Sequence, residues 1–234
     1  MKIDFFGHSI CGRRTNLDRP KTFADIIVEQ YQASNRWFGF GNGSEERILY
    51  YLKKAETPNI AIIFHSDPAF FFTPSLSCDY HRLNEHDLKE KFIYALPKFY
   101  PNRKIDKIFV ENEAYEEIDA EVARTAFLNY YDFFTTPEVN KNRFYGALIQ
   151  IDQYCTHKKI PVIHCPKSPT HIPSWFKFTS GIVDYELGLS QNDNHPFRAS
   201  YGKSDNAVTK EGNEQIAKKL IEYIDQLLIS KDKK

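Results

Sequence analysis

The chain has 234 residues, of which 41% are hydrophobic and 15% aromatic, which excludes a disordered chain and a disulfide-stapled miniprotein. Lys plus Arg and Asp plus Glu both number 31, and this formal net charge of zero disfavours a nucleic-acid coat or a polybasic membrane binder. No apolar run approaches the roughly 18 residues of a membrane span. Without a signal-peptide pattern or closely paired cysteines, we expect a cytoplasmic protein with reduced thiols.

The first third of the chain alternates short apolar runs with helix-like segments. Ser44 is placed to cap a helix that carries two acids in its first turn and two lysines in its last turn. The run at 59–64 is almost wholly apolar, which is typical of a central strand in a parallel sheet. The predicted order is strand 3–6, helix 22–31, strand 36–40, helix 45–54 and strand 59–64.

The rest of the chain continues the alternation around a less regular middle. Residues 67–157 carry many aromatics, among them Phe70-Phe71-Phe72, and several helix-like stretches. We interpret this region as a helical, aromatic-rich insertion; its aromatic residues suit a lid, an acyl pocket, a homo-oligomer surface or ordinary core. Further strands are predicted at 107–110 and 160–165, and the final helix shows an apolar face at a 3.6-residue period.

This succession of strands and helices predicts the fold class. Strands that alternate with helices form parallel sheets covered by helices on both faces. We therefore expect residues 1–234 to form a single three-layer α/β/α domain, flavodoxin-like, with a mainly parallel sheet of about five strands.

Three short segments place chemically useful residues at the ends of predicted strands or at the start of the last helix. Ser9 follows the first strand and Gly7, and Gly41-Asn42-Gly43 follows the second strand. Backbone N–H groups in such a glycine turn can face a developing negative charge. Asp205 precedes the last helix, for which Thr209 is the predicted N-cap. Each segment alone also fits an ordinary turn or helix start.

In this order and at these positions, the three segments resemble the SGNH (GDSL-like) hydrolase family over nearly the whole chain. That family has a Gly-Asp-Ser block after the first strand, a glycine block after the second, and an Asp–His block before the last helix. The resemblance implies that Ser9 is a nucleophile and that Asp205 orients a histidine base. It also implies that the backbone N–H groups of Ser9 and Gly43 line the oxyanion hole, with Gly41 or Asn42 replacing Gly43 in another register.

Three positions depart from the family pattern. His8 stands where the first block has Asp, at a position that is not the nucleophile. The family places an oxyanion asparagine after the third strand, where this chain has His65 and Ser66; either is a candidate replacement donor. The largest departure is Ala207, which occupies the position expected for the histidine base. Alanine cannot take the proton from Ser9, so the triad is incomplete.

Three explanations of Ala207 remain open. The histidine was replaced on purpose to give an inactive form, or the protein is naturally inactive and its cleft only binds, or the base comes from elsewhere. The candidate for a base from elsewhere is His195, within Asp193-Asn194-His195. His195 lacks the helix-start residues that follow Asp205, and it also suits a pocket wall or a loop cap.

The predicted function is hydrolysis of a carboxylic ester, and the alternative is a non-catalytic small-molecule or carbohydrate-binding protein on the same fold. An acylated sugar or a small thioester would suit the first function. Arg13 and Arg14 would attract an anionic ester, although they equally suit a solvated helix start. We expect no cofactor, no membrane or nucleic-acid partner, and no metal. Some cysteines and histidines lie near one another without a standard zinc spacing: Cys155, His157, His164, Cys165 and His171.

Overall fold

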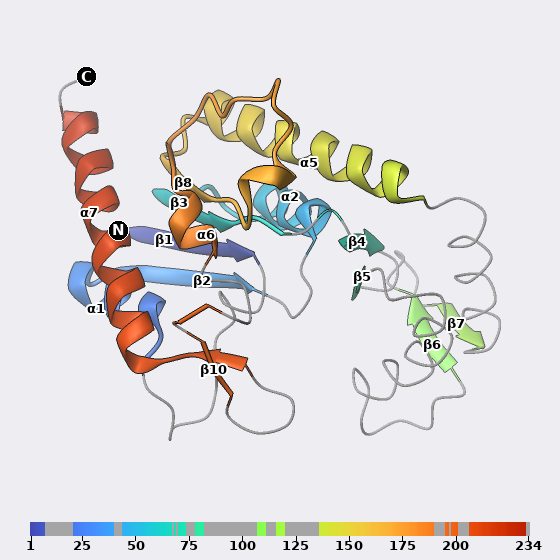
Figure 1. The fold of residues 1–234 in the computed structure, drawn as a ribbon, viewed down its shortest axis with the longest axis horizontal. Coiled ribbons are helices and arrows are strands. Elements are labelled where there is room, and N and C mark those ends of the chain that lie inside the picture. The colour runs from blue at the N-terminus through green and yellow to red at the C-terminus, as the bar shows by residue number, and fades with distance from the viewer. Residues whose placement is uncertain are drawn as a thin grey trace.

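The computed structural model describes residues 1–7, 21–39, 44–66, 68, 70–73, 78–81, 107–110, 116–119, 136–189, 195–196, 198–200 and 206–232. Its central feature is a five-stranded sheet (Figure 1). The strands are β1 (Lys2–Gly7), β2 (Ser34–Gly39), β3 (Ile60–Phe64), β8 (Val162–Cys165) and β9 (Ile182–Val183).

All neighbouring strands of this sheet are parallel, and their order is β2-β1-β3-β8-β9. Counted along the chain within the sheet, this order is 2-1-3-4-5. That is the flavodoxin-like order of doubly wound α/β proteins. The structure thus confirms the fold class predicted from the sequence.

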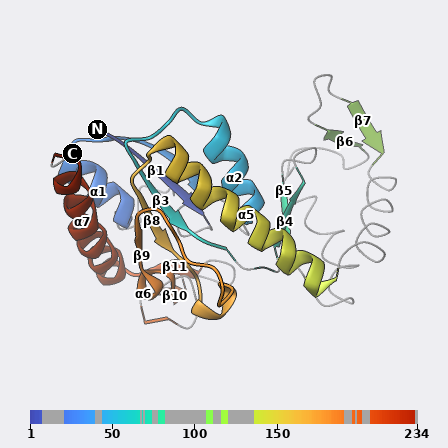
Figure 2. The same cartoon turned by 90° about the horizontal axis from the view of Figure 1, so that it is seen from above.

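Helices cover both faces of the sheet, as Figure 2 shows from above. One face carries α1 (Phe23–Tyr31), α6 (Tyr185–Leu189) and α7 (Lys210–Asp232), and the other carries α2 (Glu45–Lys54) and α5 (Pro137–Lys158).

The two cores follow from the alternation of side chains along the strands. On β1, Ile3 and Phe5 join the core beneath α1 and α7, whereas Phe6 joins the core beneath α2 and α5. On β3, Ile62 and Ile63 divide in the same way. Burial of each such side chain contributes roughly 1.5–3 kcal/mol, so the near-continuous apolar strands stabilise both layers.

Polar caps fix where the helices begin. Thr22 forms a capping box with Asp25 at the start of α1, and the Ser44 hydroxyl accepts the Arg47 N–H at the start of α2. Thr209 caps α7 by accepting the Gly212 N–H, as the sequence predicted. These caps place the strand-to-helix turns, where ligand-binding residues of α/β proteins lie.

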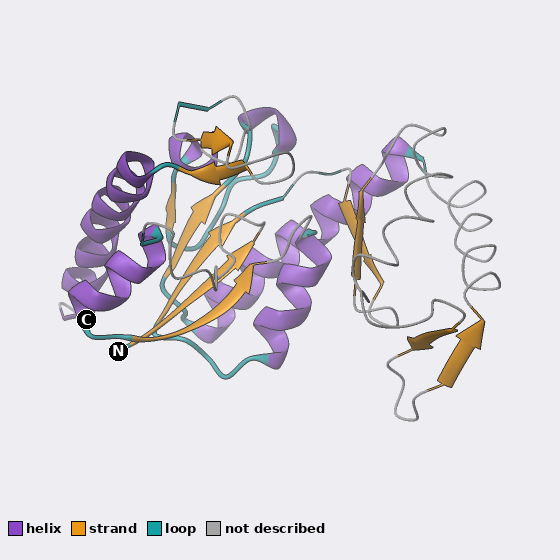
Figure 3. Cartoon of the chain, turned by 90° about the horizontal axis from the view of Figure 1, so that it is seen from below, coloured by secondary structure: helices purple, strands orange, loops and turns teal. Residues whose placement is uncertain are grey.

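Much of the middle region, predicted as a helical, aromatic-rich insertion at 67–157, lies outside the described residues. Its described part contains two antiparallel pairs, β4 (Phe70–Thr73) with β5 (Cys78–His81) and β6 (Lys107–Val110) with β7 (Glu116–Asp119). Figure 3 shows both pairs outside the five-stranded sheet. Its one described helix, α5, packs into the core under the sheet.

The fifth strand of the sheet also differs from the expected one. Residues 107–110 form a strand as predicted, but this strand pairs with β7. The place at the edge of the sheet belongs to β9, which has only two residues. A strand this short gives no period of two in the sequence, which is why it escaped prediction.

Among the described residues, no helix combines the length and the apolar character that crossing a membrane requires.

A buried carboxylate joins α6 to α7. Asp184, which follows β9, accepts hydrogen bonds from the Leu187 N–H and the Tyr223 hydroxyl, and its Oδ2 lies 2.8 Å from the Lys219 ammonium. Burial alone would raise the pKa of Asp184, but the hydrogen bonds from Lys219, Tyr223 and Leu187 outweigh burial and lower it. The folded state therefore favours the ionised form.

Replacing Asp184 by Asn should lower the free energy of unfolding by about 2–4 kcal/mol near pH 7, because Lys219 and Tyr223 lose an anionic partner. Since the folded-state pKa is lowered, this stabilisation is present above about pH 4 and is lost as the pH falls through the folded-state pKa. Urea unfolding of both proteins across this range measures the difference.

Glu186→Gln is the matched control, because Glu186 also pairs with Lys219 but is 84% exposed. We expect this control to change stability by about 0.5 kcal/mol or less. An Asp184→Asn effect that stays constant down to acid pH would contradict the assignment.

Candidate active site

Four parallel strands end level with one another at one edge of the sheet. Gly7 at the end of β1 is the register partner of Gly39 in β2 and of Phe64 in β3, and Phe64 is in turn the partner of Cys165 in β8. In a doubly wound sheet, ligands bind outside the carboxyl ends of the strands, where the strand order reverses. Here that point lies between β1 and β3.

The end of β1 requires glycine. Gly7 has a φ of +140°, and a Cβ at this position would overlap the carbonyl oxygen of Phe64 and press on the Phe64 side chain. Any other residue would therefore force β1 away from β3. This close approach fixes where the chain leaves β1 on its way to Ser9.

Several predicted site residues lie outside the described part of the chain: Ser9, Arg13, Arg14, Gly41, Asn42, Gly43 and Asp205. Described residues adjoin most of them. Gly7 precedes Ser9 by two positions, the buried N-cap Ser44 follows Gly43, and Asn206 follows Asp205.

The segment before the last helix is tied to the sheet core. Ala207 lies in β11 (Asn206–Val208), opposite Ala199 of β10 (Arg198–Ser200). Val208 joins the buried cluster that includes Phe64 and Cys165, the last residues of β3 and β8. Asn213 of α7 accepts the Phe23 N–H, which links the start of α7 to the start of α1.

His195 is half-buried, and burial lowers its pKa. The neutral form, which a general base requires, therefore dominates at pH 7.

His65 and Ser66 directly follow β3 and are buried. His65 Nδ1 lies 2.8 Å from Glu45 Oε1, and His65 Nε2 lies 2.9 Å from His164 Nδ1. The Ser66 N–H donates to the same Glu45 oxygen, whereas the Ser66 hydroxyl has no hydrogen-bond partner in the part of the chain that the structure describes. The geometry thus favours Ser66 over His65 as a donor to a ligand.

The contacts of His65 continue through the interior to α5. His164 Nε2 lies 3.1 Å from Ser180 Oγ, and Ser180 Oγ donates to Asp152 Oδ1 at 2.6 Å. Burial, and then the neighbouring His65, lower the pKa of His164 well below the usual histidine value, so His164 is neutral. The Phe178 ring stacks on the His164 ring, with 4.3 Å between the ring centroids, and covers the His65–His164 pair.

Sequence reasoning missed this buried network as a unit. A histidine inside the apolar run 160–165 was one available signal, and an acid directly after the Ser44 cap was another. Neither signal indicates which residue is the hydrogen-bond partner. The strand order alone brings together Glu45, His65, His164 and Asp152.

The cysteines and histidines that lie near one another in the sequence do not converge. Cys155 belongs to the core under α2 and α5, whereas Cys165 belongs to the core under α1 and α7. Among the residues that the structure describes, no three His, Cys, Asp or Glu side chains are grouped to hold a metal ion.

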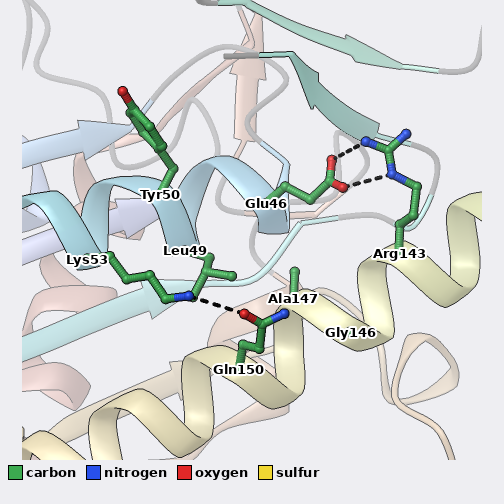
Figure 4. A pocket seen from close by; sticks show the side chains of 8 residues that line it. All are labelled: Glu46, Leu49, Tyr50, Lys53, Arg143, Gly146, Ala147 and Gln150. Carbon is green, nitrogen blue, oxygen red and sulfur yellow. Dashed lines mark hydrogen bonds and ion pairs between the residues drawn. The ribbon is translucent and has the colours of Figure 1, made fainter.

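A separate groove of about 610 Å³ lies between α2 and α5 (Figure 4). Leu49 and Ala147 are among its apolar lining residues. Glu46 of α2 and Arg143 of α5 also line it and form an ion pair. Of the predicted site residues that the structure describes, none, His65 and Ser66 included, lines this groove.

Comparisons with known proteins give likeness in three dimensions only. No family model matches the sequence, and no curated protein matches it. Two solved structures illustrate this likeness.

One is a member of the lipolytic protein G-D-S-L family from Veillonella parvula, with 11% identity over 94% of this chain and 96% of that chain, at a TM-score of 0.33. The other is described as a possible lipase from Chitinophaga pinensis, with 13% identity over 97% of this chain and 98% of that chain, at a TM-score of 0.38. The fold assignment rests on the strand order and the two helical layers of this chain.

Replacing Gly7 by Ala should lower the free energy of unfolding by about 3 kcal/mol or more, because the methyl group meets the Phe64 carbonyl at a backbone angle that favours glycine. The matched control is Gly146→Ala, since a Cβ at Gly146 in α5 meets nothing within 4 Å. The control should be neutral or stabilising by up to about 1 kcal/mol. Thermal unfolding of the two variants measures both; equal effects would show that β1 and β3 do not meet as described.

Proposed function

We propose that this protein is built as a serine ester hydrolase whose nucleophile is Ser9. The observation that carries the proposal is the level ending of β1, β2 and β3, because the segments with Ser9, with the glycines and with His65-Ser66 all leave the sheet at this edge. In the sequence, Ser9 follows Gly7, the last residue of β1, by two positions.

The glycine turn and Ser66 supply candidate donors for the oxyanion. The backbone N–H of Ser9 and that of Gly43, or of Gly41 or Asn42 in another register, would hold the negative charge that develops on the ester carbonyl. Gly43 directly precedes Ser44 at the start of α2, where the helix dipole favours negative charge. The Ser66 hydroxyl, buried and without a partner among the described residues, would add a third donor.

Hydrolysis of an ester by this chain depends on a general base that deprotonates Ser9. With histidine at position 207, the imidazole would deprotonate Ser9, Asp205 would orient it, and an acyl-serine would form and be hydrolysed by water. With Ala207 that route is missing. His195, neutral at pH 7, is the alternative base.

The substrate we propose is a small carboxylic ester, such as an acylated sugar. Arg13 and Arg14, four and five positions after Ser9, would favour an ester with an anionic group.

A second candidate function is favoured by Ala207 itself. A chain without its base would bind the ester or a related carbohydrate at the same edge and release it unchanged.

Ala207→His should raise the turnover of a short-chain activated ester by about 10³-fold or more, because it restores general-base activation of Ser9. Steady-state hydrolysis by the purified chain and by the variant measures the effect. Adding Ser9→Ala to Ala207→His should abolish the gain. An increase that survives the loss of Ser9 would contradict the assigned nucleophile.

His195→Ala in the unaltered chain separates the two bases. If His195 were the base, the starting chain would already hydrolyse the ester and this substitution would remove about 10³-fold of its activity or more. We expect low activity in the starting chain and little further change. A chain that stays inactive even with Ala207→His, yet retains ester in equilibrium dialysis, would favour the binding function.

A further inference from the structure

We propose that Glu45 and His65 hold a proton between them as a buried imidazolium–carboxylate pair, and that this pair positions Ser66 at the edge of β3. The positioning role rests on the proposed function of Ser66, whereas the buried proton is argued from the hydrogen-bond network and does not depend on that function. No group in this pair belongs to the Ser9–Asp205–position 207 triad.

The pair is part of a continuous buried chain of hydrogen bonds. From α2 to α5 its members are Glu45, His65, His164, Ser180 and Asp152. Glu45 and Asp152 are 1% and 2% exposed, and both histidines are fully buried. Each contact from Glu45 Oε1 to Asp152 pairs a donor with an acceptor, so the protons along this line can be counted. The second oxygen of Glu45, Oε2, is buried and has no hydrogen-bond partner among the described residues.

The count starts at Asp152. Its two oxygens accept the N–H and hydroxyl groups of Thr179 and of Ser180, so Asp152 acts as an acceptor toward four donors. The Ser180 hydroxyl has one proton, and the 2.6 Å contact shows that it is donated to Asp152. Ser180 Oγ therefore faces His164 Nε2 with a lone pair, and His164 must carry its proton on Nε2.

The count continues to His65. Because His164 is neutral with its proton on Nε2, its Nδ1 is an acceptor, and His65 Nε2 must donate to it at 2.9 Å. On the other side of the ring, His65 Nδ1 meets Glu45 Oε1, which also accepts the Ser66 N–H. If Glu45 is ionised, both contacts of Oε1 need a donor, so Nδ1 carries a proton as well and His65 has both ring protons.

The competing arrangement breaks one of these contacts. If His65 were neutral with its proton on Nδ1, His164 would have to donate from Nδ1 and accept at Nε2. The Ser180 proton would then turn to His164, and two oxygen lone pairs would face each other across the 2.6 Å contact with Asp152. A second alternative places the proton on Glu45 Oε1, which would then donate to Nδ1 of a neutral His65. The first turn of α2 favours the ionised carboxylate over this acid, because the helix dipole stabilises negative charge there.

One oxygen of Glu45, Oε1, connects the Glu45–His65 pair to the turn after β3. Glu45 Oε1 accepts from both His65 Nδ1 and the Ser66 backbone, so the imidazolium holds the carboxylate where it binds the Ser66 N–H. This fixes the turn after β3, beside Gly7. His65 and Glu45 are therefore positioning residues, which act on the edge through Ser66.

Nitrogen-15 NMR of the histidine rings in the whole chain tests the proton directly. At neutral pH we expect His65 to show two protonated ring nitrogens and His164 to show a proton on Nε2 only. Single His65→Gln and His164→Gln variants assign the signals among the eight histidines. A His65 with one ring proton would overturn the proposal, and this measurement needs no substrate.

Glu45→Gln tests the positioning. A neutral amide cannot stabilise the second proton of His65, and its NH₂ group turns toward Nδ1, so the Ser66 N–H loses its acceptor. We expect hydrogen exchange at the Ser66 amide to accelerate about tenfold or more, as for a lost hydrogen bond. In the Ala207→His background we expect kcat to fall by about tenfold or more and KM to change little.

Glu46→Gln is the matched control. Glu46 is the next residue of α2, but its carboxylate points into the α2–α5 groove and pairs with Arg143 (Figure 4). It should leave the His65 protons and Ser66 exchange unchanged. Unchanged Ser66 exchange in a folded Glu45→Gln protein would overturn the positioning role, and if this variant does not fold, the NMR result on the starting chain decides. Absence of ester hydrolysis by Ala207→His with the two protons still on His65 would instead reject the proposed function alone.

Discussion

The close contact between β1 and β3 at Gly7 is the constraint on which the rest of this site depends. Parallel strands joined by helices have no turn that fixes their relative register, so the register must come from packing along the strands. Gly7 lets the end of β1 lie against the Phe64 carbonyl, and the same residue is in register with Gly39 of β2. The segments that follow β1, β2 and β3 in the sequence therefore all begin at the same edge of the sheet.

The buried network adds a second constraint at the same edge. Burying charged and polar groups is costly, and a network that is only partly paired is worse than an apolar core. Here the chain from Glu45 to Asp152 joins the first turn of α2, the ends of β3 and β8 and the middle of α5. Apolar side chains in place of this network would pack equally well, but they would not orient the turn at Ser66. The network therefore contributes a fixed arrangement of these elements.

Much of the fold was predictable from the sequence, for physical reasons that differ between elements. The boundaries of α2 followed from Ser44, the two acids and the two lysines, which act locally. The strands β1, β3 and β8 followed from apolar runs. By contrast, β9 has two residues and owes its place to β8, and β6 pairs locally with β7 although its pattern resembles a core strand. Such choices depend on neighbours in space, which a pattern of residue types does not contain.

The candidate site divides in the same way. The sequence placed Ser9, the glycines and Asp205 next to predicted elements. The resemblance to the SGNH family implied their roles and marked Ala207 as the position expected for the histidine base. It also singled out His65 and Ser66 without distinguishing them. Their difference comes from Glu45 and His164, which take both nitrogens of the His65 ring, and these partners are 20 and 99 positions away.

The central claim is that Ser9 is a nucleophile at this edge, and covalent labelling tests it most directly. The Ala207→His protein would be treated with a phosphonate ester that reacts with activated serines, and the product would be examined by intact-mass and peptide mass spectrometry. The account predicts one phosphonyl group per chain, located on Ser9, and none when Ser9 is replaced by Ala. A protein that stays unlabelled, or that carries the label on another residue, would contradict it.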